Sequence, residues 1–311
     1  MIRSKTSPSR APFIRAASTA SDFLWKRSAA LLIPAAAAVF FYGPAALALF
    51  AASAAAAVLA ERAMGFILKK PVPFQGGHAL GIGLTLALML PPGLPLWMAV
   101  LGAVFAVAVA RDAFGGPGQA PLPPILAGFL FLAVSFPLEM RAVTDPVTGH
   151  AAAHGLAWLK DGVADSGPHL SRIFMTPQPG GAGMVFFPAL AAAGLLLIFQ
   201  RLVFWELPFL FLAASALTAF GFGEHPAAAL AGSNAFAAFF LISEGMTAPH
   251  NRHGARFFAL LAGFLAAALR QVSGAFDPSA AAVMMVSFLT PWLEEAGRTE
   301  RGWAPPRGAS A

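Results

Sequence analysis

Residues 114–124 read Phe114-Gly-Gly-Pro-Gly-Gln-Ala-Pro-Leu-Pro-Pro124 and lie between two long apolar runs. The string cannot be continuous helix, because each proline removes an amide donor and its ring clashes with the preceding turn. Non-helical backbone at membrane depth survives only where it is buried in protein or lines a polar cavity. If the flanking runs are membrane spans, the segment is the strongest pointer to a functional site in the sequence. The alternative is a tight cytoplasmic turn.

The composition indicates a membrane protein. The chain is 58% hydrophobic and 11% charged, and its mean hydropathy is +0.71. A soluble domain usually has about 25% charged residues. The sequence therefore predicts a polytopic membrane protein that contacts the lipid bilayer. It has no cysteine, which excludes disulfides, thiolate-bound iron–sulfur clusters and c-type haem.

Basic residues are concentrated before the first apolar run. They are opposed there only by Asp22, and comprise Arg3, Lys5, Arg10, Arg15, Lys26 and Arg27. The segment is too long for the basic region of a signal peptide, and the apolar character continues past a signal core. We interpret it as an unprocessed cytoplasmic N-terminus. Nucleic-acid binding is not predicted, because no interleaving of basic and aromatic residues accompanies the charge.

Ten apolar segments predict ten transmembrane helices. Several are shorter than the roughly 20 residues that cross a bilayer, notably the third and the eighth, as broken helices would be. Five segments lie on each side of a polar island, so the two sets cross the membrane in opposite senses. The predicted fold is an all-α polytopic membrane protein with two inverted five-helix halves. The segments are 29–43, 45–67, 78–91, 94–111, 123–139, 184–203, 207–222, 227–243, 256–270 and 277–292.

These segments predict the domain organisation. A cytoplasmic N-terminal segment is followed by one half, an external loop, the other half and a cytoplasmic tail: 1–28, 29–139, 140–183, 184–292 and 293–311. Lysine and arginine favour cytoplasmic loops, and the loop 140–183 is sparsely basic for its length. Both termini are therefore expected in the cytoplasm. By span count the counterpart of 114–124 is 271–278, whereas by composition it is 244–256.

Three smaller groups of residues leave alternatives open. Glu244 ends a span, where it is expected to face water or a partner, or to be a plain interfacial carboxylate. His150 and His154 have the i, i+4 spacing that a metal site on a helix needs, or are two solvent-facing histidines. The adjacent pairs Glu61 and Arg62, and Arg111 and Asp112, could pair with each other or anchor helix ends at the interface.

Several motifs in this order resemble one family. They are Leu84-Thr-Leu-Ala-Leu-Met-Leu-Pro-Pro-Gly-Leu-Pro95, Phe114-Gly-Gly-Pro-Gly-Gln119, Ser135-Phe-Pro137, and Phe239-Phe240 followed by Thr247 and Pro249. The chain resembles the D subunit of the Rnf electron-transport complex and the B subunit of the sodium-pumping NADH:quinone oxidoreductase. The resemblance implies two inverted five-helix halves, as in urea transporters. It also implies electron transfer coupled to sodium or proton translocation.

The same resemblance implies a flavin mononucleotide ester-linked to the threonine of a Ser-Gly-Ala-Thr motif in the external loop. This chain has Ala151 at that threonine position, and alanine has no hydroxyl. The family's Gly-Gln-Asn-Pro-x-Asn-Pro pattern loses both asparagines, at Ala120 and Pro123. We therefore expect FMN or riboflavin to be bound without a covalent link, or not at all. The expected flavin-contacting residues are Gly115, Gly116, Gly118, Gln119, Thr148, Gly149, Gly180, Gly183 and Thr247.

The sequence thus predicts an integral subunit of an Rnf-like complex in the bacterial inner membrane. It would act as scaffold and electron conduit, beside other membrane subunits and iron–sulfur and flavin-binding proteins. The alternative is a small-solute or ion channel on the urea-transporter-like scaffold. In either case no residue is expected to be catalytic in this chain alone.

Overall fold

The protein is described by a computed structural model, which covers residues 20–69, 77–152, 176–223, 226, 232–244, 248–249, 251–272 and 278–296. In this part of the chain the protein is an all-α polytopic membrane protein apart from one short hairpin. Three helices are long and apolar enough to cross a bilayer, Ser21–Tyr42, Pro44–Ile67 and Leu96–Phe114, and shorter apolar helices accompany them. Each predicted apolar segment overlaps a helix among the described residues; 227–231 and 277 lie outside them.

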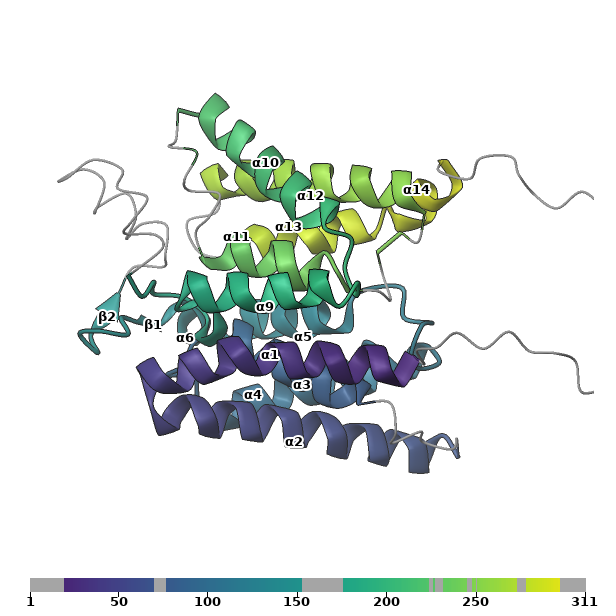
Figure 1. Cartoon of the computed structure of the whole chain (residues 1–311). Coiled ribbons are helices and arrows are strands. Elements are labelled where there is room, and N and C mark those ends of the chain that lie inside the picture. The colour runs from purple at the N-terminus through teal and green to yellow at the C-terminus, as the bar shows by residue number, and fades with distance from the viewer. Residues whose placement is uncertain are drawn as a thin grey trace, which may run out of the picture.

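The first set of helices forms the lower part of the molecule in Figure 1. Prolines begin α2, α5 and α6, where the missing amide hydrogen costs nothing. A π-helical turn, η2, interrupts the end of α4, and Ala110 N donates to Phe105 O at 3.0 Å. The elements are α1 (Ala20–Tyr42), α2 (Pro44–Ile67), α3 (His78–Met89), α4 (Leu96–Val104), η2 (Phe105–Val109), η3 (Asp112–Phe114), α5 (Pro124–Ser135) and α6 (Pro137–Arg141).

A two-stranded antiparallel hairpin follows, β1 (Val143–Thr144) and β2 (Ala151–Ala152). The second set of helices forms the upper part of the molecule. Its elements are η4 (Ala182–Met184), α9 (Phe187–Phe199), α10 (Glu206–Gly221), α11 (Gly232–Phe236), η6 (Ala237–Leu241), α12 (Arg252–Val272), α13 (Pro278–Ser287) and α14 (Thr290–Ala296). Here η6 is a second π-helical turn, in which Ile242 N donates to Ala237 O at 3.0 Å.

The two sets pack in the same order. In the first set α2 packs on α3 and α4, and α4 and η2 pack on α5; in the second set α10 packs on η6 and α12, and α12 packs on α13. Where the sets meet, α1 lies beside α9 and α5 lies beside α13. Figure 1 shows α1 and α9 running in opposite directions. The arrangement is that of an inverted repeat, with one hydrophobic core continuous through both sets.

This order assigns a counterpart to each helix break. The break 115–123 precedes α5, so its counterpart precedes α13, as the span count predicts; residues 273–277 lie outside the described residues. The break that begins at Glu244 follows η6 and is the counterpart of residues 90–95, which follow α3. The helix order therefore disagrees with the match by composition between 114–124 and 244–256.

Candidate functional site

The short helices α3, α5, α11 and α13 end inside the packed molecule, and their ends create two buried junctions. One junction lies at the end of the molecule where α1 begins, and the other at the opposite end (Figure 1). At each junction, two helix N-termini from one set meet the C-terminal end of a short helix from the other set. Helix ends carry unpaired backbone groups and partial charges, so each junction needs polar partners.

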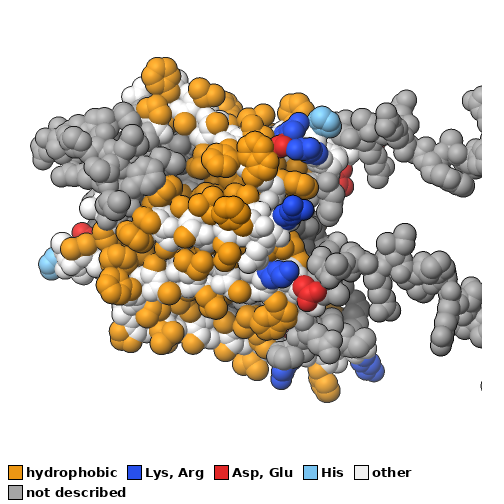
Figure 2. Space-filling model, viewed as in Figure 1, with side chains coloured by type: hydrophobic (Ala, Val, Ile, Leu, Met, Phe, Trp, Pro, Cys, Tyr) orange, Lys and Arg blue, Asp and Glu red, His pale blue; other side chains and the backbone are white. Residues whose placement is uncertain are grey.

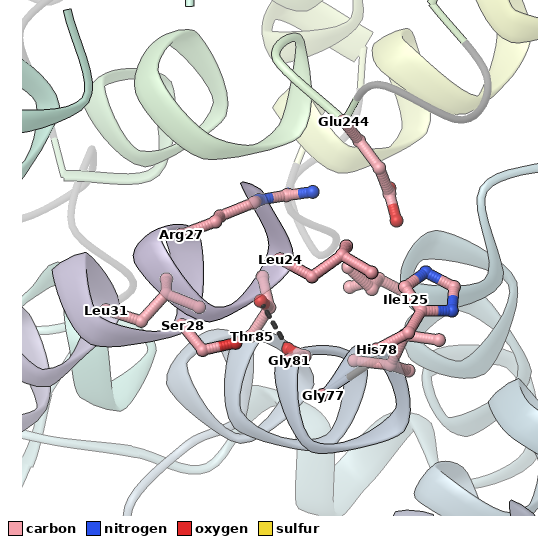
Figure 3. Close-up of a pocket in the computed structure, with 11 residues that line it drawn as sticks. Leu24, Arg27, Ser28, Leu31, Gly77, His78, Gly81, Thr85, Ile125 and Glu244 are labelled. Atoms are coloured by element: carbon pink, nitrogen blue, oxygen red, sulfur yellow. Dashed lines mark hydrogen bonds between the residues drawn. The ribbon is translucent and has the colours of Figure 1, made fainter. Parts of the chain in front are cut away.

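The first junction, here called the charged junction, is formed by Arg27, His78 and Glu244. These residues line one small cavity, between the start of α1, the start of α3, Ile125 of α5 and the end of η6. In Figure 3 the Glu244 side chain points down between Arg27 and His78. The rest of the lining is Leu24, Ser28, Leu31, Gly77, Gly81, Ile82 and Thr85.

Arg27 joins the two sets of helices. Its Nη2 donates to Phe240 O at 2.9 Å, so a side chain from α1 caps the C-terminal end of η6. Ser243 Oγ also donates to Phe239 O, at 2.6 Å. A cation near a helix C-terminus is favourable, because the free carbonyls there carry partial negative charge. Arg27 thus provides a donor for a free carbonyl at the end of η6, a helix that ends inside the protein.

A second group of charges is centred on Arg111, which is 1% exposed. Its guanidinium binds both oxygens of Asp112, at 2.7 and 3.0 Å, and Glu61 Oε1 of α2 at 2.9 Å. Its Nη1 lies 3.2 Å from His78 Nδ1. Because a guanidinium can only donate, Nδ1 must accept, and the proton of the neutral imidazole is then on Nε2. The Arg111 group therefore fixes the protonation of a ring that lines the cavity.

The sequence left these residues open between pairing and interfacial anchoring, and the structure shows pairing. Glu61 and Arg111 come from different helices, so their contact could not be read from the adjacent pairs in the sequence. Glu244 was expected to face water or a partner, or to be interfacial; it is 1% exposed and faces the cavity. Arg27 was assigned to the segment before the first span, but α1 begins at Ala20 and includes it.

The second junction, here called the neutral junction, is formed by Gln178, Asn234 and Ser279 at the opposite end. Gln178 Oε1 accepts from Gly232 N, the first residue of α11, at 2.8 Å. Asn234 Nδ2 donates to Ser215 Oγ at 2.9 Å, and Ser279 Oγ donates to Asn234 Oδ1. Ala182 N donates to Leu90 O beyond the end of α3 at 2.8 Å. Hydrogen bonds between uncharged groups thus satisfy these helix ends.

The predicted flavin residues fall into separate places. Gly115, Gly116 and Gly118 have φ of 119°, 108° and 82°, a conformation that suits glycine. The loop is mostly exposed, Gln119 included, and its residues are not in the cavity lining. This is the geometry of the tight turn, the alternative that the sequence left open; whether the loop contacts a ligand stays a prediction.

The other predicted flavin residues lie at the opposite end of the molecule or outside the described residues. Thr148 and Gly149 are exposed in the hairpin turn, where Asp145 Oδ1 accepts from Thr148 N at 3.4 Å. Gly180 and Gly183 are buried near the end of α3, and a Cβ on Gly183 would lie 2.7 Å from Leu88 Cβ. Thr247 lies outside the described residues. The structure thus separates the 115–119 loop from the hairpin residues.

The proposed histidine pair cannot be placed as a pair. His150 is exposed in the hairpin turn, and His154 lies outside the described residues. Within the described ranges, no group of three or more His, Asp and Glu side chains could hold a metal ion.

Comparison with known proteins decides the family. The model of the NQR2, RnfD, RnfE family matches residues 7–301. The chain belongs to this family. It is 31% identical over 294 residues to the D subunit of the Na⁺-translocating ferredoxin:NAD⁺ oxidoreductase complex of Acetobacterium woodii, covering 92% of each chain. It is 31% identical over 287 residues to the D subunit of the ion-translocating oxidoreductase complex of Methanosarcina acetivorans, covering 91% of this chain and 92% of that one.

A more distant member gives the same assignment. The chain is 30% identical over 285 residues to the D subunit of the ion-translocating oxidoreductase complex of Escherichia coli (strain SE11), covering 76% of this chain and 81% of that one. Proteins with the same name in bacterial and archaeal species thus match along most of their length. The family resemblance seen in the sequence motifs is confirmed.

Proposed function

We propose that the chain is the D-type subunit of an ion-coupled electron-transport complex in the bacterial inner membrane. The observation that carries this proposal is the family match over residues 7–301, together with relatives that bear the name of this subunit and are covered almost end to end. The all-helical membrane fold agrees with such a role. Other membrane subunits of the complex are its partners, and iron–sulfur and flavin-binding proteins complete the electron path.

We also propose that both termini lie in the cytoplasm. The start of α1 and the end of α14 lie at one end of the molecule in Figure 1. On the face seen in Figure 2, the lysine and arginine side chains lie at that same end. Because cytoplasmic loops carry the excess of lysine and arginine, this end is assigned to the cytoplasm. Arg141, in α6, and Arg270, in the last turn of α12, are exceptions at the opposite end.

The residues of the hairpin do not fit a covalent flavin. Ala151 lies on β2, paired with Thr144 of β1, and it offers no oxygen for a phosphoester. Thr148 lies three residues earlier in the hairpin turn, where its backbone nitrogen is bound by Asp145. Any FMN or riboflavin is therefore bound without a covalent link. Without flavin, this chain serves the complex as a scaffold rather than as an electron conduit.

Two measurements on the purified chain test this proposal. Flavin fluorescence on a denaturing gel would show a covalent link and would contradict the assignment of Ala151. The absorbance spectrum of the native protein then distinguishes bound flavin from none. Co-purification with iron–sulfur and flavin-binding subunits supports the complex, whereas flux of urea-sized solutes through liposomes that hold the chain alone would support a channel instead.

A further inference from the structure

Within the described residues, no hydrogen bond of the Glu244 side chain accounts for its burial. It is 1% exposed, and neither carboxylate oxygen has a hydrogen-bond partner among the described residues. Its hydrogen bonds are made by its backbone, to Leu241 O and from Ala248 N. A buried carboxylate without partners is costly. The buried carboxylate therefore indicates that its oxygens bind a molecule or ion other than the described side chains.

The groups that face Glu244 come from each element around the cavity. On α1, Arg27 carries a positive charge, and its Nε has no hydrogen-bond partner in the part of the chain that the structure describes. On α3, His78 is held neutral by Arg111, which lies behind it. On α5, the lining residue is the apolar Ile125. Figure 3 shows Arg27, His78 and Glu244 on three sides of the same space.

The side chains that line the cavity decide whether it suits a metal cation, an anion or water. A metal cation would need several oxygen ligands, but the polar lining consists of one carboxylate, two hydroxyls and nitrogen donors. One of the hydroxyls, Thr85 Oγ1, already donates to Gly81 O at 2.7 Å. The Arg27 guanidinium would also repel a cation. An anion would be repelled by Glu244. Water meets both demands, because it donates to a carboxylate and accepts from N–H groups.

The cavity has room for about one water molecule. The space open to the centre of a water molecule is about 10 Å³, close to the roughly 10–15 Å³ that a single bound water needs. Arg27 and Leu24 are only half-buried, so the cavity lies close to the surface of the end where α1 begins. A hydrated carboxyl there can exchange a proton with the surrounding water.

We infer that the charged junction is a proton-exchange site, in which cavity water joins Glu244 to Arg27 and Glu244 takes up and releases one proton. With the carboxylate ionised, Arg27 and Glu244 sum to zero charge. When a proton from the cavity water binds a carboxylate oxygen, the pair carries one positive charge. Arg27 also caps η6, so proton uptake changes the attraction between α1 and the end of a helix from the other set. The inference does not rest on electron transport, because the chain alone contains the site.

Infrared difference spectroscopy of the full chain in lipid nanodiscs tests this. We expect a protonated-carboxyl band that disappears as the pH rises and shifts in D₂O. The band should be lost in Glu244→Gln and kept, at a changed frequency, in Glu244→Asp. Glu206→Gln is the matched control, because Glu206 lies at the same end but is paired with Arg252 and Arg256; it should leave the band unchanged.

The role of Arg27 gives a second readout. Arg27→Met removes the opposite charge, so the pH of half-conversion should rise by about one unit or more, and Arg27→Lys should restore it in part. This arm remains informative if Glu244→Gln fails to fold. A band that is identical in all variants, or insensitive to D₂O, would overturn the inference. A band removed by Na⁺ at constant pH would replace it with a cation site.

Discussion

The charged and neutral junctions occupy equivalent places in the two sets of helices, yet different kinds of side chain provide the polar partners of their helix ends. Both join two helix N-termini to the end of a short helix from the other set. In the neutral junction, Asn234 hydrogen-bonds to the side chains of Ser215 and Ser279, and Gln178 accepts from the backbone of Gly232. The charged junction leaves a cavity and the unpaired oxygens of Glu244. A structural repeat therefore supplies two junctions, and among the described residues the charged one leaves a carboxylate facing its cavity.

The largest effect is expected at the arginine behind the charged junction. Arg111→Met should destabilise the protein by about 3–5 kcal/mol, because the buried Asp112 and the half-buried Glu61 would lose their arginine partner. Arg62→Met removes an exposed arginine from the same turn of α2 as Glu61 and should cost much less. Unfolding in mixed micelles measures both variants. Equal losses would show that the Arg111 group does not support the junction.

The charge balance inside the charged junction can be measured by a double-mutant cycle. Arg27→Met leaves Glu244 uncompensated, so it should cost more stability than Glu244→Gln. Combined, the two changes should cost less than their sum, with a coupling free energy of about 0.5–3 kcal/mol. Unfolding of the four proteins under identical conditions gives this value. Additive losses would mean that the two charges do not sense each other.

The neutral junction should respond differently. Asn234→Leu leaves Ser215 and Ser279 without their amide partner, at a cost of about 1–3 kcal/mol. Because no charge is involved, this loss should be the same at each pH at which the wild type is folded. Unfolding curves recorded over a pH series test this. A loss that varies with pH would remove the distinction between the two junctions.

The smallest effect is expected from one hydroxyl at the neutral junction. Ser279→Ala removes the donor to Asn234 Oδ1, at a cost of about 0.5–1.5 kcal/mol. Ser287→Ala is a matched control, since Ser287 is also buried in α13 but donates within its own helix, to Val283 O at 2.7 Å. If both variants lose the same stability, the hydrogen bond from Ser279 to α11 contributes no more than the bond that Ser287 makes within its own helix.

The sequence by itself determined the class of fold. Long apolar runs must form helices in a membrane, because no other local structure satisfies the backbone there, and each predicted span overlaps a helix among the described residues. The prolines of 114–124 required a break in the helix, because proline lacks an amide donor and clashes with the preceding turn. Motif order also identified the family. The absent hydroxyl at Ala151 is likewise visible without a structure.

Tertiary structure alone decided which residues meet. Arg27 was grouped with a basic leader, and Glu61 was not recognised as a partner of Arg111, because hydropathy and spacing describe only residues that are close along the chain. The contact between Arg27 and Phe240 joins residues 213 positions apart. Such contacts depend on how two sets of helices pack, and helical periodicity carries no information about that. The cavity at Glu244 is therefore a property of the fold, formed where helices from both sets end together.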